Sequence, residues 1–187
     1  MEIKDISLAE FLGHRTKWRI DKYANDADFA AKKKYESVEI DGNVLCNEGI
    51  NELLTILGSA SSGTKYDNTN AYLIVGTGDT AAAAANTEAS FTNGVKKAME
   101  SGFPTYGTSQ KITFSSSYGS SDANQAWKEF GVLNASSSGK LLNRKVSDQG
   151  TKTSGLTKVL ARVKSLVING EHLRQLFAMA TLSKQAI

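Results

Sequence analysis

Residues 126–134 read AWKEFGVLN, and they are the clearest indicator of fold class in the chain. Alternation along a strand places Trp127 on one face and Phe130 and Val132 on the other. Because both faces carry large apolar groups, we expect both faces to be buried. Such a strand is typical of the interior of a β-sandwich, where it is covered on two sides.

Further segments with strand character lie on both sides of this one. They are Arg15–Tyr23, Tyr35–Ile40, Ala71–Gly76, Val95–Met99, Lys111–Tyr118, Lys140–Val146 and Thr157–Ile168. Strands that recur at a spacing of roughly 10–15 residues, without intervening helices, are typical of antiparallel sheets. The sequence therefore predicts a mainly β protein, an antiparallel β-sandwich of jelly-roll-like form.

One short helix is predicted near residues 48–57. Asn47 is a good N-cap, Glu48 favours the positive start of a helix, and Gly58 suits the C-terminal end. Four apolar residues share one helical face: Ile50, Leu53, Leu54 and Leu57. We expect this face to lie against one edge of a sheet.

Two other segments lack a regular apolar pattern. Residues 25–34 are polar and rich in Asp and Lys, which predicts a linker. Residues 80–85 contain five consecutive alanines, but no cap or amphipathic pattern supports more than two helical turns there.

The chain divides into an N-terminal arm (residues 1–14), a β-sandwich domain (15–168) and a C-terminal helical tail (169–187). The arm has apolar residues at near-helical spacing: Ile3, Ile6, Leu8, Phe11 and Leu12. The tail is predicted to be helical from Glu171 to Leu182. Both segments are short for isolated helices, so each needs another surface to lie on.

The composition argues against several classes of protein. The formal net charge is +3, and Lys and Arg are spread along the chain rather than gathered in the dense basic stripe of a nucleic-acid-binding protein. Cys46 is the single cysteine, which excludes an internal disulfide, and its apolar neighbours predict a buried position. His14 and His172 have no neighbours at metal-ligand spacing, so no metal or other cofactor is expected.

The sequence gives no indication of a membrane protein. No apolar segment approaches the roughly 18–20 residues of a membrane-spanning helix. The first residues lack the apolar centre of a signal peptide, so we expect synthesis in the cytoplasm.

No motif for catalysis stands out. No serine lies in a Gly-x-Ser-x-Gly motif, although a Ser-His-Asp triad can assemble from distant positions. Residues 75–79 (VGTGD) match a phosphate-binding turn only in part, and a tight turn explains their glycines better. The sequence therefore favours a protein without enzymatic activity.

Trp18 and Trp127 are the bulkiest side chains. We expect both to anchor the core, where each would bury on the order of 200 Å². The alternative is an exposed aromatic group that binds a sugar or a receptor.

Several short motifs occur in a characteristic order. They are LCNEGIN (45–51), YLIVGTGD (72–79), GSSDAN (119–124), WKEFGVLN (127–134), LLNRKV (141–146) and GTKT (150–153). In this order they resemble a family of small virion proteins of tailed bacteriophages, often labelled tail-fibre or hypothetical structural proteins. The similarity runs from about Arg15 to Ile168, and a looser one exists to tail-collar fibre modules. The chain departs from the family pattern in its arm and beyond Asn169.

This resemblance implies a non-enzymatic structural protein on the exterior of a virion, made in the cytoplasm of a host bacterium. A capsid cement or decoration protein is favoured over a tail or tail-fibre subunit. The implied partners are the major capsid protein or tail proteins and further copies of the chain, with a trimer as one option. Neither nucleic acid nor a membrane is an expected partner.

We expect the assembly interface to combine the two extensions with nearby residues of the body. Its predicted residues are Ile3, Ile6, Leu8, Phe11, Leu12, Trp18, Arg19, Leu173, Leu176 and Phe177, with Lys32–Lys34 nearby. The alternative function is a host receptor or glycan-binding module. That module would use the polar loops Ser59–Asn70, Phe103–Ser109 and Ser136–Gly139.

Overall fold

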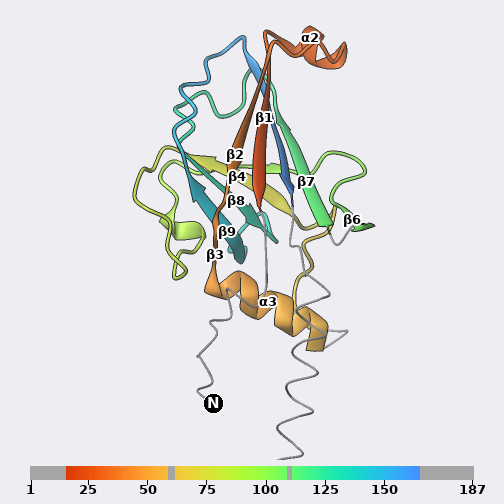
Figure 1. Cartoon of the computed structure of the whole chain (residues 1–187), viewed down its shortest axis with the longest axis vertical. Coiled ribbons are helices and arrows are strands. Elements are labelled where there is room, and N and C mark those ends of the chain that lie inside the picture. Colours follow the sequence, from red (N-terminus) through yellow and green to blue (C-terminus); the bar gives the residue numbers. More distant parts are fainter. Residues whose placement is uncertain (1–15, 59–61, 109–110, 165–187) are drawn as a thin grey trace, which may run out of the picture.

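The computed structural model of the chain describes residues 16–58, 62–108 and 111–164. Within these ranges ten strands form two antiparallel five-stranded sheets, which confirms the prediction of a mainly β sandwich (Figure 1). The predictions for the arm and for the helical tail concern residues outside these ranges. They include the interface residues from Ile3 to Leu12 and from Leu173 to Phe177.

The first sheet joins the two ends of the described chain. Its strand order is β2 (Glu36–Asp41), β1 (Lys17–Tyr23), β10 (Thr157–Lys164), β7 (Lys111–Tyr118) and β6 (Thr105–Thr108). β1 and β10 are adjacent and antiparallel, so Lys17 lies opposite Lys164. The first and last strands of the described chain are therefore paired in the interior of this sheet.

The second sheet contains the most deeply buried strand of those described. Its order is β3 (Val44–Leu45), β9 (Leu141–Val146), β8 (Glu129–Leu133), β4 (Tyr72–Gly76) and β5 (Val95–Ala98). All five residues of β8 are buried, as predicted for an interior strand. β8 begins at Glu129 rather than at Ala126, because Ala126 instead forms an isolated bridge with Thr151.

The core lies between the two sheets and is dominated by aromatic side chains. Trp18 and Trp127 are completely buried, which confirms the prediction that both anchor the core. The ring centroids of Trp18 and Phe130 are 5.8 Å apart, and those of Tyr118 and Trp127 are 5.0 Å apart. Cys46 is also fully buried, and burial raises the pKa of its thiol to about 11.

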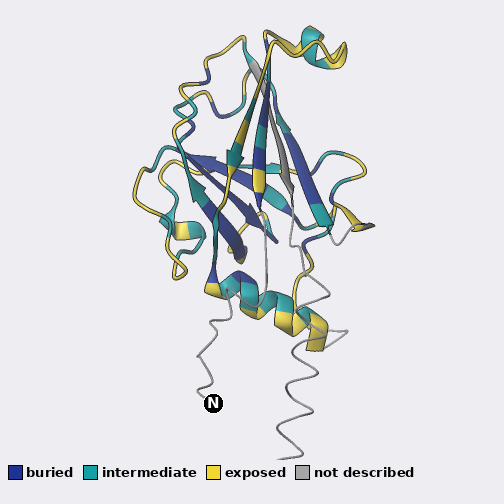
Figure 2. Ribbon diagram, in the orientation of Figure 1, coloured by how far each residue is buried: buried dark blue, intermediate teal, exposed yellow. Residues whose placement is uncertain are grey.

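The predicted helix is present as α3 (Asn47–Gly58), but it is rotated relative to the prediction. Leu53 and Ile56 pack against the core, whereas Leu54 and Leu57 are 60% and 82% exposed. Figure 2 shows exposed residues on α3 beside partly buried ones. The reason is Gly49, which is buried against β9. A Cβ atom at Gly49 would lie 2.4 Å from the Leu142 Cα, so only a glycine allows this close approach. Gly49 thus fixes the inward face of the helix.

Several short elements were not predicted from the sequence. The expected linker at residues 25–34 contains α2 (Asp26–Ala30), whose N-cap is the Asn25 side chain, accepting a hydrogen bond from the Asp28 backbone N–H at 2.8 Å. The ring of Phe29 then packs edge-on against Tyr23 at 5.3 Å. β3, β6 and the 3₁₀ turn η1 (Glu88–Ser90) are also too short to give a periodic pattern.

Candidate functional site

Both flanking segments connect to the sandwich at one end of the molecule. β1 begins and β10 ends at this end, because Lys17 pairs with Lys164. The Gly42 backbone N–H donates to the Thr16 carbonyl at 2.9 Å, which places the β2–β3 turn beside the start of β1. α3 follows β3 and lies across this end, whereas α2 lies at the opposite end (Figure 1). We call these the α3 end and the α2 end.

The α3 end carries two exposed leucines. Leu54 and Leu57 are three residues apart on α3, so their side chains are neighbours on the helix surface. The other large apolar side chains exposed in the described chain are Tyr35 and Tyr106. A leucine that is mostly exposed contributes little to the stability of the fold. Two adjacent exposed leucines form a small apolar surface that a partner can contact.

The predicted interface residues of the body separate in the structure. The Trp18 side chain lies wholly inside the core, so it is not available to a partner, which corrects its place in the predicted interface. Arg19 points outward and forms a bidentate ion pair with Asp21, with N–O distances of 2.9 and 2.6 Å. Lys34 also pairs with Asp21, at 3.4 Å. The structure thus brings Arg19 and Lys34 together around one carboxylate.

The groups around Asp21 lower the pKa of its carboxyl group. Burial alone would raise its pKa, but hydrogen bonds from Arg19 and Ser37 and the positive charges of Arg19 and Lys34 outweigh burial. The pKa of Asp21 therefore falls to about 2. Sequence alone did not identify this cluster, because Ser37 and Lys34 reach it from another strand and its preceding loop.

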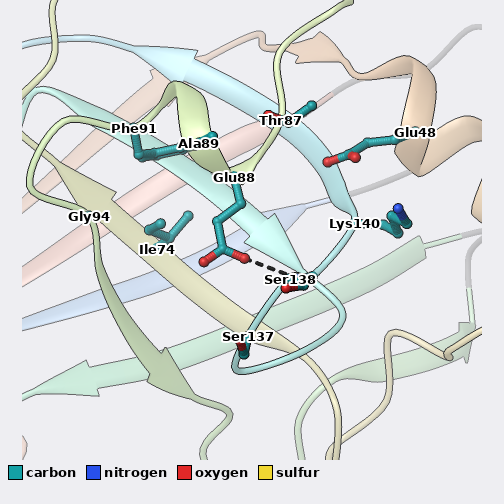
Figure 3. A pocket seen from close by; sticks show the side chains of 11 residues that line it. Glu48, Ile74, Thr87, Glu88, Ala89, Phe91, Gly94, Ser137, Ser138 and Lys140 are labelled. Carbon is teal, nitrogen blue, oxygen red and sulfur yellow. Dashed lines mark hydrogen bonds between the residues drawn. The ribbon is translucent and has the colours of Figure 1, made fainter.

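A pocket of about 540 Å³ lies between two loops on the side of the second sheet (Figure 3). One wall comes from residues 87–94, which precede β5, and the other from residues 137–140, which precede β9. We call it the loop pocket. Its lining includes Glu48 of α3, Ile74 of β4, and Glu88, Phe91, Ser138 and Lys140 of the loops.

One carboxylate joins the two walls of the loop pocket, and a second joins α3 to the start of β9 beside it. Glu88 accepts a hydrogen bond from the Gly139 backbone N–H at 3.0 Å and also pairs with Lys96. Glu48 accepts one from the Leu141 backbone N–H at 2.7 Å. The pocket is therefore a fixed part of the fold rather than a gap between loose loops.

Only one of the three polar loops predicted to bind a ligand contributes to this pocket. It is Ser136–Gly139, through Ser137, Ser138 and Gly139. The described parts of the other two loops meet elsewhere, where the Asn68 side-chain amide donates to the Phe103 carbonyl at 2.5 Å. The wall that carries Glu88 was not predicted, because nothing in the local sequence links this residue to a loop some fifty residues later.

A buried ion pair lies under the turn at residues 75–79. Glu129 of β8 and Arg144 of β9 are diagonal neighbours on adjacent strands, almost wholly buried, and joined at 2.6 Å. The other Glu129 oxygen accepts hydrogen bonds from the Gly78 and Thr92 backbone N–H groups at 2.7 and 2.8 Å. A Cβ atom at Gly78 would lie 2.5 Å from that oxygen, which explains this glycine more fully than turn geometry alone.

Arg144 completes the network on its far side. Its guanidinium donates to the Thr80 carbonyl at 3.1 Å and to the Asn86 side chain at 3.0 Å, and it lies 5.5 Å from the centroid of the Phe91 ring. The polar groups of Glu129 and Arg144 are thus used to hold the irregular chain of residues 77–94 onto the sheet. The sequence signal for this site is a glutamate in an otherwise apolar interior strand, because a buried charge needs a partner.

No protein-family model, curated protein or solved structure matches this chain. No family is assigned. Among the residues that the structure describes, no three His, Cys, Asp or Glu side chains are grouped so that they could hold a metal ion. None of the helices in that part of the chain is both long and apolar enough to cross a membrane.

Proposed function

We propose that the chain is a non-enzymatic structural protein of a tailed-phage virion, attached to the particle exterior through its α3 end. One observation carries this proposal. Both flanking segments connect at the α3 end, and the exposed Leu54 and Leu57 lie there as well. Flanking segments and an apolar surface at the same end suit a protein that docks by that end and exposes the rest of its sandwich to solvent.

The energetics favour docking through many modest contacts. Burying a leucine side chain contributes about 1.5–3 kcal/mol, so Leu54 and Leu57 alone give a weak interface. The flanking segments would extend it toward the ~1,600 Å² of an ordinary protein–protein interface. Repetition of the same contact over a particle raises the overall binding strength further.

A capsid cement or decoration protein remains the favoured form of this proposal. A cement protein needs one attachment end and a body that faces outward. A tail or tail-fibre subunit, the alternative, would stack through interfaces at both ends. The α2 end supports the first form, because its residues from Ala24 to Ala27 and from Ala30 to Ser37 are exposed and largely polar.

The use of buried polar groups also supports a structural role. Glu129 and Arg144 satisfy each other and a loop. Lys152 is fully buried and donates to the Asn124 side chain at 2.7 Å and the Ser120 carbonyl at 3.3 Å. Burial lowers the pKa of Lys152, but its amine is directed at a loop of its own fold rather than at an open cleft. The buried Glu129, Arg144 and Lys152 side chains therefore all bind loops of the fold itself.

The test is to replace the two exposed leucines and measure incorporation into particles. The variant Leu54→Gln/Leu57→Gln keeps good helix formers on α3 but removes the apolar surface. We expect at least about tenfold less of the chain on purified particles, since 1.4 kcal/mol corresponds to tenfold in binding. The matched control is Tyr35→Gln, which changes an exposed apolar side chain at the α2 end.

Circular dichroism should show that both variants remain folded, because neither replaces a buried side chain. Equal incorporation of the double variant and the wild type would reject the α3 end as the attachment site. Deletion of residues 1–14 tests the arm in the same assay, and unchanged incorporation would reject its role.

A further inference from the structure

We propose that the loop pocket binds a neutral sugar unit of a glycan. This activity is separate from docking, and it rests on the size, charge, floor and hydrogen-bonding groups of the pocket. The pocket is lined by groups from α3, β4 and the two loops, all within the described chain.

The size of the pocket fits a small polar ligand. Its volume of about 540 Å³ lies in the range of small-molecule sites, roughly 300–1,000 Å³. The pocket is open to solvent rather than enclosed, and Figure 3 shows the side chains that line it. A sugar ring can enter while the rest of a glycan chain continues into solvent.

The charges around the pocket cancel. Two carboxylates, Glu48 and Glu88, line it, and they face two ammonium groups: Lys140 also lines it, and Lys96 pairs with Glu88. A pocket for phosphate or an acidic sugar would carry excess positive charge, and one for an amine would carry excess negative charge. Balanced charge favours a neutral ligand.

The floor of the pocket is apolar while its rim is polar. Ile74 and Phe91 contribute the apolar part, and Gly94 keeps it open. A Cβ atom at Gly94 would lie 2.8 Å from the Ile74 Cδ1, so a larger residue would crowd the floor. A pyranose has the matching character, because it presents C–H groups on a ring face and hydroxyl groups around its edge.

The rim offers hydrogen-bonding groups that the fold does not use. The hydroxyls of Ser137 and Ser138 and the ammonium of Lys140 make no hydrogen bond within the described residues, and one oxygen of Glu48 is likewise unused there. Donors and acceptors of this mixed kind match sugar hydroxyls, which act as both.

The loop that carries these serines is held in a costly conformation. Ser138 has a φ of +52°, in the left-handed region, which is unfavourable for a residue with a side chain. The neighbouring backbone is fixed by Glu88, and by Asn134, whose side chain accepts a hydrogen bond from the Lys140 N–H at 2.7 Å. Strain of this sort is typical of binding loops that are ordered before the ligand arrives.

The experiment is an NMR titration of the full-length, isotope-labelled chain with four neutral sugars. The probes are glucose, galactose, mannose and N-acetylglucosamine, each added up to about 50 mM, so that dissociation constants in the millimolar range are detected. We expect at least one of them to shift the amide signals of residues 87–91 and 137–141. Galacturonic acid, glucosamine and inorganic phosphate are the charged comparisons.

A matched pair of variants locates the site. Ser137→Trp places a bulky ring in the pocket from an exposed position, and should reduce binding at least tenfold. Ser136→Trp changes the preceding residue, which is exposed but does not line the pocket, and should bind as the wild type does.

Three results would overturn the proposal: no shift with any neutral sugar, binding of a charged probe alone, or binding that survives in Ser137→Trp. None of them touches the docking proposal, which is tested by the amount of chain on particles and depends on Leu54 and Leu57. The two ideas can therefore fail independently.

Discussion

At the scale of single residues, the most deeply buried ion pair in the described chain is Glu129 and Arg144. Two charges removed from water are costly, and the pair is stable only because both partners are hydrogen-bonded on all sides. Removing one partner would leave the other charged in the interior.

We expect Arg144→Met to lower the free energy of unfolding by about 3–5 kcal/mol, since it leaves Glu129 buried without its cation. The matched control is Lys17→Met, which breaks an exposed pair with Glu39 and should leave the free energy of unfolding almost unchanged. Denaturant unfolding measures both. Similar losses in the two variants would mean that Glu129 is not held as described.

Asp21 gives a prediction about pH. Its pKa is about 2 in the folded chain against an ordinary value of 3.8, so the folded state favours the carboxylate. The resulting stability is fully present above pH 3.8 and is lost as the pH falls toward 2, and it amounts to about 1–2 kcal/mol after allowance for solvent screening.

We therefore expect Asp21→Asn to destabilise the protein near neutral pH, with a difference from the wild type that shrinks between about pH 4 and pH 2. Unfolding followed by fluorescence across that range measures it. Asp79→Asn, at a side chain that is 81% exposed, should leave stability unchanged at every pH. A pH-independent difference for Asp21→Asn would contradict the assignment.

At the scale of elements, α3 is placed by a glycine rather than by its leucines. The predicted apolar face of α3 was correct for Leu53, which packs against the core, and wrong for Leu54 and Leu57, which are exposed. Gly49 decides which face lies inward, because the helix can touch the β9 backbone only along the line on which Gly49 lies.

We expect Gly49→Ala to destabilise the protein by about 1–3 kcal/mol, although alanine is the better helix former. Its Cβ would meet the backbone of Leu141 and Leu142, which cannot rotate away. Gly58→Ala is the control in the same helix. It has open space around it, so it should be neutral or slightly stabilising in thermal unfolding. Equal stability of the two variants would show that α3 does not contact β9 so closely.

A comparison of predicted and observed elements shows which of them sequence patterns can identify. The strand predicted at Lys111–Tyr118 has those bounds in the structure, and β1, β2, β4, β5, β9 and the helix lie where alternation or helical spacing placed them. Local patterns suffice where a segment alternates, forms an apolar run or shows helical spacing. The short elements β3, β6 and α2 carry no such pattern over enough residues to be recognised.

The sites were harder to predict than the strands, for a physical reason. Glu129 and Arg144 come together because β8 and β9 are neighbours, and the loop pocket forms because residues 87–94 precede β5 while residues 137–140 follow β8. Such contacts depend on strand order and register, which periodicity does not encode. The serine loop was predicted, but its acidic partner Glu88 was not.

At the scale of the whole molecule, the two ends of the sandwich differ in kind. The α3 end receives both flanking segments and carries Leu54 and Leu57, while the α2 end is polar and carries Lys32 and Lys33. A protein that docks by its α3 end should have other virion proteins close to that end, while its α2 end faces solvent. Because both ends carry lysines, a lysine-reactive cross-linker can test this arrangement.

Cross-linking mass spectrometry of purified phage particles, with a lysine-reactive reagent, is the most direct measurement of this arrangement. Lys17 lies at the α3 end with its side chain 47% exposed, so we expect it to form cross-links to other virion proteins. Lys32 and Lys33, exposed at the α2 end, should react with the reagent without linking to a partner. Links through Lys32 and Lys33 with none through Lys17, or particles that contain none of the chain, would contradict attachment by the α3 end.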